Sequence, residues 1–467
     1  MMSKIKEESE ECSTSQLEWF SVAPTQTAIE RSSDVEHQSL TSLKENSCVE
    51  FFVPAATEEY FDLENSRLYT KCRIVSEDGT AIDGDAVVAP INDLHNGLWN
   101  NVEFYLNDRL VSHSNNTHGY TSTISHLAHD SEESLNSERA MRLIYKDTPS
   151  QMDTTEARRA NPNNLIAGHD IERRVAGATV TYARYAADAN LGNHGLYQRY
   201  CTSRLSQEIE LLGPLRIDMF EQERYLPSGV NIKLRFHRQK SAYTLMSAQD
   251  DYKIEILDCF LLMRKVRPSP GVQLGHHDAL LKTPAKFPIT RKECKVMSVA
   301  TGLRDFKKDS LFLGQLPKMV IVGMVDSDAS AGISTKNPYN FKLNDVNHMQ
   351  LFADGEPVRT RPLRPKAGDH NYMHCYETLY RGLNRMDGEK SSIIKRVDWD
   401  KGYSLFAFDL TPDMDADDHY PLIKHGNLRL EIEFGTALAE PISILVYAEF
   451  DNIIEITLDR HVQIDYV

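Results

Sequence analysis

Histidine and aspartate side chains that could bind a metal ion are spaced closely at one place in the first half of the chain. His126, His129 and Asp130 are three and four residues apart, so a helix would bring them to one face. Imidazole and carboxylate groups are ligands that zinc accepts. A polar face on a short helix explains the same spacing without a metal, and we favour that interpretation.

Two further acidic or histidine-rich segments are weaker candidates. Asp413–His419 begins like a calcium-binding loop, but it lacks the glycine at the sixth position and the glutamate at the twelfth. We interpret it as a solvated acidic loop. His276, His277 and Asp278 stand at the start of the second half and could bind a metal or respond to pH. An exposed linker fits their setting better.

Basic residues form one run that could contact nucleic acid or an acidic partner, namely Arg359, Arg361, Arg364 and Lys366. They lie between prolines, and a solvated loop is the simpler interpretation. The whole chain has 52 lysines and arginines against 68 aspartates and glutamates, a formal net charge of -16. Proteins that bind phosphates as their main task are usually basic, so we do not expect nucleic acid as the primary ligand.

Catalytic motifs are missing from the sequence. It contains no nucleophile elbow, phosphate-binding loop, dinucleotide fingerprint or HExxH zinc motif. We therefore predict that the protein is not an enzyme, with no catalytic, cofactor-binding or metal-binding residues and no cofactor. The 7 cysteines are odd in number and form no CxxC pair, which favours a reducing compartment. A charged start and the lack of a run of about 18 apolar residues predict no signal peptide and no membrane span.

The pattern of apolar residues predicts an all-β protein. Leu215–Met219, Ile232–Phe236 and Leu428–Phe434 alternate apolar and polar residues, as strands with one wet face do. Leu257–Met263 and Ile442–Phe450 are apolar throughout, which indicates strands covered on both faces. The first 45 residues are polar and predict a flexible N-terminal arm, with Leu17–Phe20 as a short apolar anchor. Short helices are expected near Ile91–Trp99 and Thr121–His129.

An internal repeat is the most informative feature of the sequence. Three pairs of segments recur in the same order in both halves: Phe104–Val111 with Leu351–Val358, His118–Leu127 with His370–Leu379, and Asn231–Leu234 with Asn427–Leu430. The first pair has Asn-Asp and Asp-Gly at tight hairpin turns. The repeat predicts a duplicated β-unit, with domains over 46–270 and 271–467 and a join near Pro268–Gly271. Only the first unit has a long polar insert, over about 130–212.

Several long segments resemble one protein family. In the second half they are Phe312–Ala329, Asn337–Glu356, Tyr403–Asp413 and Leu422–Ile456; in the first half they are Glu50–Tyr69, Ile144–Asp153 and Arg224–Arg238. The resemblance runs from about residue 20 to the end. It is to the double jelly-roll major capsid proteins of Maverick/Polinton elements and adintoviruses, relatives of virophage and adenovirus hexon proteins.

The resemblance implies two eight-stranded antiparallel β-sandwiches in tandem, and a homotrimer whose six sandwiches make a pseudo-hexagonal unit of an icosahedral capsid. It implies further copies and a minor capsid or penton protein as partners, with weak contact to packaged double-stranded DNA. It places the protein in the virion capsid, after synthesis in the host cytoplasm and assembly in the nucleus. The 130–212 insert would be an outer tower. A minor capsid or vertex protein, a host-domesticated β-sandwich binding protein, and a β-sandwich enzyme or lectin are the alternatives.

Overall fold

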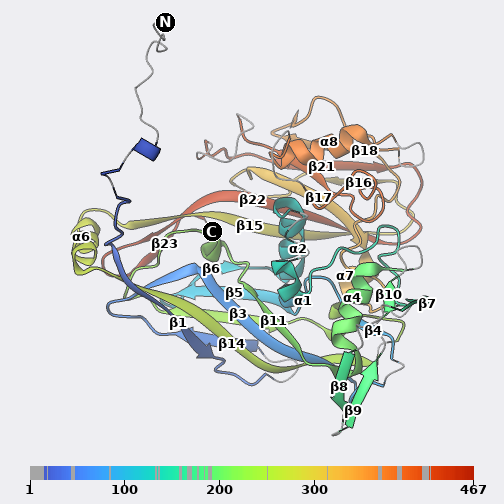
Figure 1. Cartoon of the computed structure of the whole chain (residues 1–467). Coiled ribbons are helices and arrows are strands. Elements are labelled where there is room, and N and C mark those ends of the chain that lie inside the picture. The colour runs from blue at the N-terminus through green and yellow to red at the C-terminus, as the bar shows by residue number, and fades with distance from the viewer. Residues whose placement is uncertain are drawn as a thin grey trace, which may run out of the picture.

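The computed structural model places two β-sandwiches side by side along one chain (Figure 1). It describes residues 15–17, 19–20, 22–43, 48–83, 86–131, 134, 137–156, 160–165, 171–175, 178–182, 185–187, 192–249, 251–312, 314–366, 371–386, 392–412, 420 and 422–466. Two four-stranded sheets come from the first half of the chain, and a five-stranded and a four-stranded sheet come from the second half.

The first sandwich is built from eight strands. One sheet has the order β1-β14-β3-β11, and the facing sheet has the order β2-β12-β5-β6. All neighbours are antiparallel. The strands are β1 (Ile29–Gln38), β2 (Cys48–Val53), β3 (Tyr60–Ser76), β5 (Trp99–Leu106), β6 (Arg109–His113), β11 (Ile209–Pro214), β12 (Ile232–Arg238) and β14 (Tyr252–Pro268).

The second sandwich repeats this arrangement strand for strand. Its sheets have the orders β15-β22-β17-β20 and β16-β21-β18-β19, so its strands occupy the same places in the same chain order. The strands are β15 (Ala285–Val299), β16 (Asp305–Lys308), β17 (Met319–Asp326), β18 (Val346–Ala353), β19 (Glu356–Pro357), β20 (Phe406–Asp409), β21 (Leu428–Phe434) and β22 (Ile442–Ile456). Two four-stranded sheets with this connectivity make a jelly roll. The predicted tandem double jelly roll is therefore confirmed.

The hairpins that the repeat predicted have matching turns. Asn107 and Asp108 join β5 to β6, and Asp354 and Gly355 join β18 to β19, all with positive φ. Asparagine, aspartate and glycine tolerate that backbone conformation best. In each roll the turn residue binds the start of the next central strand. The Asn231 amide donates to the Asn107 side chain over 2.8 Å, and the Asn427 amide donates to Asp354 over 2.7 Å.

Helices and short strands fill the connections between the main strands. The helices are α1 (Leu94–Gly97), α2 (His118–His129), α4 (His194–Ser203), α5 (Ser241–Thr244), α6 (Pro270–Leu280), α7 (Ser327–Ala331) and α8 (Met373–Gly382), with 3-10 turns at Ser15–Leu17, Glu138–Arg142, Arg204–Ser206 and Asp218–Glu221. The short strands are β4 (Val88–Pro90), β7 (Ala160–Leu165), β8 (Ile171–Val175), β9 (Ala178–Tyr182), β10 (Tyr185–Ala187), β13 (Leu245–Ser247) and β23 (Val462–Ile464).

Strand β1 lies inside the region for which the sequence predicts a flexible arm. Residues 29–38 pair with β14 along their whole length, from Ile29 opposite Pro268 to Gln38 opposite Phe260. A polar composition does not exclude a strand here, because backbone hydrogen bonds hold an edge strand while most of its side chains remain exposed. The sheet order therefore places β1 in the first roll, outside the predicted bounds of 46–270.

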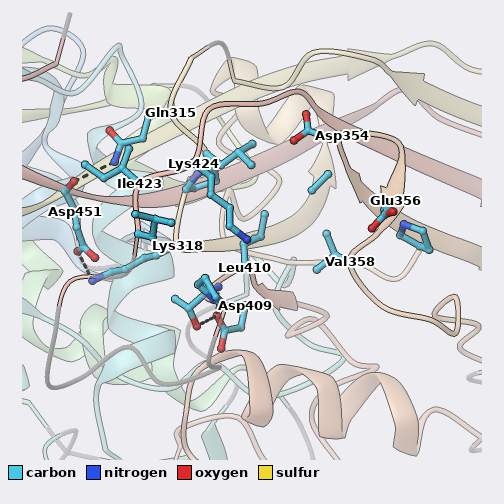
Figure 2. A pocket seen from close by; sticks show the side chains of 17 residues that line it. Gln315, Lys318, Asp354, Glu356, Val358, Asp409, Leu410, Ile423, Lys424 and Asp451 are labelled. Atoms are coloured by element: carbon cyan, nitrogen blue, oxygen red, sulfur yellow. Dashed lines mark hydrogen bonds and ion pairs between the residues drawn. The ribbon is translucent and has the colours of Figure 1, made fainter.

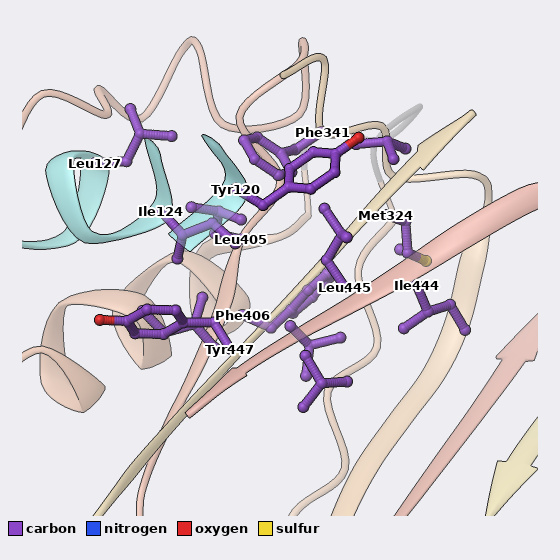
Figure 3. Packing of buried hydrophobic residues seen from close by; sticks show 14 of the residues in the cluster. Tyr120, Ile124, Leu127, Met324, Phe341, Leu405, Phe406, Ile444, Leu445 and Tyr447 are labelled. Atoms are coloured by element: carbon purple, nitrogen blue, oxygen red, sulfur yellow. The ribbon is translucent and has the colours of Figure 1, made fainter. Parts of the chain in front are cut away.

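The two rolls share their hydrophobic cores. Helix α2 comes from the connection between β6 and β11, yet its apolar side chains belong to the cluster that fills the second roll. Figure 3 shows Tyr120 and Ile124 of α2 beside Leu405, Phe406 and Tyr447. In return, residues at the ends of β15 and β22 belong to the cluster of the first roll. Removing one roll would therefore expose apolar residues of the other.

Candidate functional site

The histidines of α2 have separate partners and do not form a joint metal site. His126 is buried, and its Nδ1 hydrogen-bonds Asp130, which also pairs with Arg139. His129 instead reaches across to β22, where its Nε2 lies 3.0 Å from Glu449 Oε1. Within the described part of the chain, no group of three or more histidine, cysteine, aspartate or glutamate side chains is placed to hold a metal ion.

Both carboxylates beside these histidines are strongly acidic. Burial acts to raise the pKa of Asp130, but the hydrogen bond and charge of His126 and the charge of Arg139 outweigh it and lower the pKa to about 2. For Glu449, the charge of His129 and its hydrogen bond outweigh burial in the same way, and the pKa falls to about 2. The Asp130–Arg139 ion pair and the His129–Glu449 contact connect α2 to neighbouring segments, which is a structural role. Burial lowers the pKa of His126.

The remaining candidates from the sequence lie apart from one another. Asp413–His419 falls outside the described residues. His276 is on α6, where its Nδ1 lies 3.1 Å from the Tyr60 hydroxyl. In the basic run, Arg359 is half-buried while Arg361, Arg364 and Lys366 are exposed. In the part of the chain that the structure describes, six cysteines form no disulfide: Cys48, Cys72, Cys201, Cys259, Cys294 and Cys375.

The seam between the rolls was not predicted from the sequence. Strand β15 is at the edge of its sheet, and side chains of the first roll bind its free backbone groups. The Lys292 amide donates to Asp218 Oδ1 over 3.2 Å, Arg224 donates to the Lys286 carbonyl over 2.6 Å, and the Thr117 hydroxyl lies 3.4 Å from the Cys294 carbonyl. An edge strand with open hydrogen-bonding groups is a natural site for pairing, and here the chain covers it itself.

Asp218 stands in a connection that the sequence assigned to a strand. Leu215, Ile217 and Met219 are buried alternately, as predicted, but the strand ends at Pro214 and Asp218 begins a 3-10 turn. The prediction over Leu215–Met219 is wrong: the ladder between β11 and β3 ends at Pro214, opposite Arg67. Beyond it the Asp218 side chain binds β15, and the Arg216 side chain pairs with Glu221 over 3.2 Å. Periodicity could show which side chains are buried, but not these partners.

The buried carboxyl of Asp218 makes the seam sensitive to pH. Burial raises its pKa to about 7, against the opposing charge of Lys292. A carboxyl whose pKa is higher in the folded chain than in the unfolded chain costs stability as pH rises between the two values. We expect Asp218→Asn to remove this loss, since an amide oxygen can still accept from the Lys292 amide.

The expected result is a free energy of unfolding that, relative to the unsubstituted protein, grows by up to about 1.4 kcal/mol per pH unit between about pH 4 and pH 7. Urea unfolding at several pH values and one fixed protein concentration measures it. As a control, Asp78→Asn alters an exposed aspartate away from the seam. The prediction would be contradicted if the free energy of unfolding of Asp218→Asn, minus that of the unsubstituted protein, stayed constant or fell as the pH rises.

The end of the chain covers the hairpin of the first roll. Asn107 donates to the Arg460 carbonyl over 2.8 Å, Arg109 donates to the Val462 carbonyl over 2.7 Å, and the Tyr466 hydroxyl donates to the Val111 carbonyl over 2.9 Å. The segment after β22 thus belongs to the same seam as β15.

A groove of about 480 Å³ lies on the corresponding side of the second roll (Figure 2). Its walls come from the ends of β18, β19 and β20 and from the segment before β21. Lys318 pairs with Asp451 over 2.8 Å at one end, and Leu410 and Val358 lie between Lys318 and Glu356 in Figure 2. Leu422 and Ile423 line it while remaining 79% and 52% exposed.

The groove is lined by apolar and charged side chains. Among the described residues that line it, none is a histidine, cysteine or serine. Asp409 is engaged locally, where its Oδ1 accepts from the Thr411 amide over 2.8 Å and from the Thr411 hydroxyl over 2.7 Å. Apolar side chains with charges at the rim are typical of a protein contact surface. No helix in the described part of the chain is long and apolar enough to cross a membrane.

Comparison with known proteins gives distant relatives over nearly the whole chain. No family model matches the sequence. An uncharacterized protein of Caenorhabditis elegans is 20% identical over 435 residues, which cover 90% of this chain and 93% of that protein.

Among solved structures, a chain of the Sputnik virophage superposes with a TM-score of 0.63 at 12% identity, covering 99% of this chain and 94% of that one. The mavirus major capsid protein gives 0.54 at 10% identity, with 99% and 97% covered. The Faustovirus major capsid protein gives 0.55 at 8% identity, with 93% and 92% covered. At such identities these likenesses establish the shared double jelly-roll fold.

Proposed function

We propose that this protein is the structural major capsid protein of an icosahedral DNA virus or a virus-like transposon of the Maverick/Polinton and adintovirus type. The observation that carries the proposal is the pair of jelly rolls with identical strand order in one chain. Three such chains give six equivalent lobes, which tile a surface while the trimer keeps a closed symmetry. The solved relatives with this fold include chains named as major capsid proteins.

The division of the chain follows from the same proposal. The first roll ends near residue 270 and the second begins after α6, so one linker joins two lobes of a capsomer. The insert over 130–212 connects β6 to β11 and is our candidate for an outer tower. It contains α4, whose Leu196 and Tyr200 belong to the cluster that fills the second roll.

The proposed role as a capsid protein also determines which partners we expect and that no catalysis is expected. The protein acts by assembly and not by catalysis, with further copies, a minor capsid or penton protein and, weakly, packaged double-stranded DNA as its contacts. The exposed Arg361, Arg364 and Lys366 are the groups that would touch DNA. The site of action is the virion capsid, reached after cytoplasmic synthesis and nuclear assembly.

Measurement of mass and shape tests the proposal. Light scattering of the purified full chain at micromolar concentration is expected to give three chain masses, because a permanent trimer would bury more than about 2,000 Å² per interface. Negative-stain images are expected to show pseudo-hexagonal particles. A monomer at that concentration would contradict the proposed trimeric capsomer. A trimer found only at particle vertices would favour the alternative function, a minor capsid protein.

A further inference from the structure

The contact between the two rolls of one chain shows how a first edge strand is covered. β15 and β1 hold the same place in their sheets, each at the edge beside the last long strand of its roll. The edge of β15 is bound by Asp218, Arg224 and Thr117 of the first roll. Among the described strands β1 pairs with β14 alone, and the side chain that binds its backbone is that of the preceding Gln26, which accepts from the Ile29 amide over 3.1 Å.

The covering groups come from defined connections. Thr117 follows β6, and Asp218 and Arg224 lie between β11 and β12. The strands β19, β20 and β21 hold the same places in the second roll as β6, β11 and β12 in the first. The equivalent connection, between β20 and β21, supplies Leu410–Pro412 and Leu422–Lys424, and these line the groove. The groove of the second roll therefore corresponds to the surface that receives β15 in the first.

We propose that the groove of one copy binds the β1 edge of a second copy, as the first roll binds β15 within the chain. The inference rests on the proposed trimer and assigns its contact surface. Each chain has one groove and one uncovered β1 edge, so the contact is head-to-tail and closes when the third copy meets the first. In a closed ring no groove and no β1 edge stays open to solvent.

The side chains of the two surfaces suit each other. The groove presents Leu422 and Ile423, two large apolar side chains that are more than half exposed in a single chain. It also presents the exposed Lys424, and its other charged lining residues are Lys318, Asp354, Glu356, Asp409 and Asp451. The exposed residues of β1 include Glu36, and Glu30, which lies 3.7 Å from Arg267 of its own chain. Burying the apolar pair gives affinity, and pairing of Lys424 with Glu36 fixes the register.

Helix α6 extends the same argument. In the second roll, the segment after β22 covers the hairpin turn of the first roll. In the first roll, the segment after β14 is α6, none of whose residues is buried, with Leu274 and the adjoining Leu281 64% and 62% exposed. A helix of eleven residues is marginal in water without packing partners. If the segment after β14 binds a neighbouring copy as the segment after β22 binds the first roll, α6 lies at the β18–β19 turn of that copy.

Cross-linking between differently labelled copies tests the contact. Unlabelled and 15N-labelled full-length chains are unfolded in urea, mixed and refolded together, so that trimers contain both isotopes. They are then treated with a carbodiimide that joins lysine to carboxylate and analysed by peptide mass spectrometry. The expected products are mixed-isotope links from Lys424 to Glu30, Asp34 or Glu36. Trimers in which Lys424 forms no such link overturn the surface assignment and leave the proposed function standing, whereas a protein that stays monomeric overturns both.

A substitution in the groove gives an independent measurement. Ile423→Glu is expected to raise the dissociation constant of the trimer by about tenfold or more, because it would bury an unpaired charge. Leu303→Glu, on the exposed turn after β15, is the matched control and is expected to leave the constant unchanged. Circular dichroism establishes that both variants fold. A folded Ile423→Glu variant that associates as well as the control contradicts the proposal.

Discussion

Replacing Arg199 by alanine is expected to lower the free energy of unfolding by about 3–5 kcal/mol. Arg199 of α4 is fully buried, and its Nη2 donates to Asp147 Oδ1 over 2.8 Å. Its Nε also donates to the Pro90 carbonyl over 2.8 Å. The substitution leaves the buried Asp147 carboxylate without its counter-charge, and that isolated charge accounts for most of the expected loss.

The effect should reach the second roll, because Asp147 is the point where the rolls meet. The Asn337 side-chain amide donates to Asp147 Oδ2 over 3.1 Å, and the Tyr403 hydroxyl donates to the Asp147 carbonyl over 2.9 Å. Both residues belong to the second half of the chain. Loss of Arg199 therefore loosens the join between the lobes as well as α4 itself.

A surface ion pair gives the matched control for this prediction. Arg73 and Glu255 are 2.7 Å apart on neighbouring strands, with side chains 37% and 45% exposed. Arg73→Ala should cost less than about 1 kcal/mol, because solvent screens exposed pairs. Urea unfolding at one fixed protein concentration compares the variants, since assembly would add to the apparent stability. Equal losses for Arg199→Ala and Arg73→Ala would contradict the argument.

Local features of the sequence predicted local features of the fold. Asn107-Asp108 and Asp354-Gly355 specify tight turns because few other residues tolerate their positive φ. The alternation in Ile232–Phe236 and Leu428–Phe434 marks the central strands β12 and β21. Repetition of these signals in order was enough to predict two similar rolls, since each roll is assembled from the same hairpin and the same returning strand.

Distant partners could not be predicted in this way. β1 pairs with a strand more than 200 residues away, and its composition resembles that of a solvated tail. Asp218 lies in an alternating stretch, yet its partner is the Lys292 amide on the other roll. His126 and His129 share a helix face, but His126 binds the nearby Asp130 while His129 binds Glu449 of β22. For β1, Asp218 and His129, a contact between remote segments decides the role of the residue.

Truncation of Trp399 to alanine is the second change with a large expected effect, a loss of about 3–5 kcal/mol. Trp399 is fully buried in the connection between α8 and β20. Its ring stacks on Tyr372 with centroids 5.3 Å apart and meets Phe406 edge-on at 5.3 Å, and its Nε1 donates to the Leu405 carbonyl over 3.0 Å. Alanine would leave a cavity and an unpaired carbonyl in the middle of the second roll.

Replacing an exposed tryptophan by alanine tests whether the expected loss of stability comes from lost packing and not from losing a tryptophan as such. Trp19 is 78% exposed, so Trp19→Ala should leave the urea midpoint of the chain unchanged. Trp399→Phe keeps an aromatic ring against Tyr372 but loses the hydrogen bond to Leu405, and it should fall between alanine and the unsubstituted protein. If Trp399→Ala unfolded at the same urea concentration as Trp19→Ala, the connection between α8 and β20 would not be part of the cooperative core.

The packing around Trp399 also supports the groove, because Phe406 belongs to β20, which lies beside it. A second copy can therefore bind there only if this part of the second roll is stably packed.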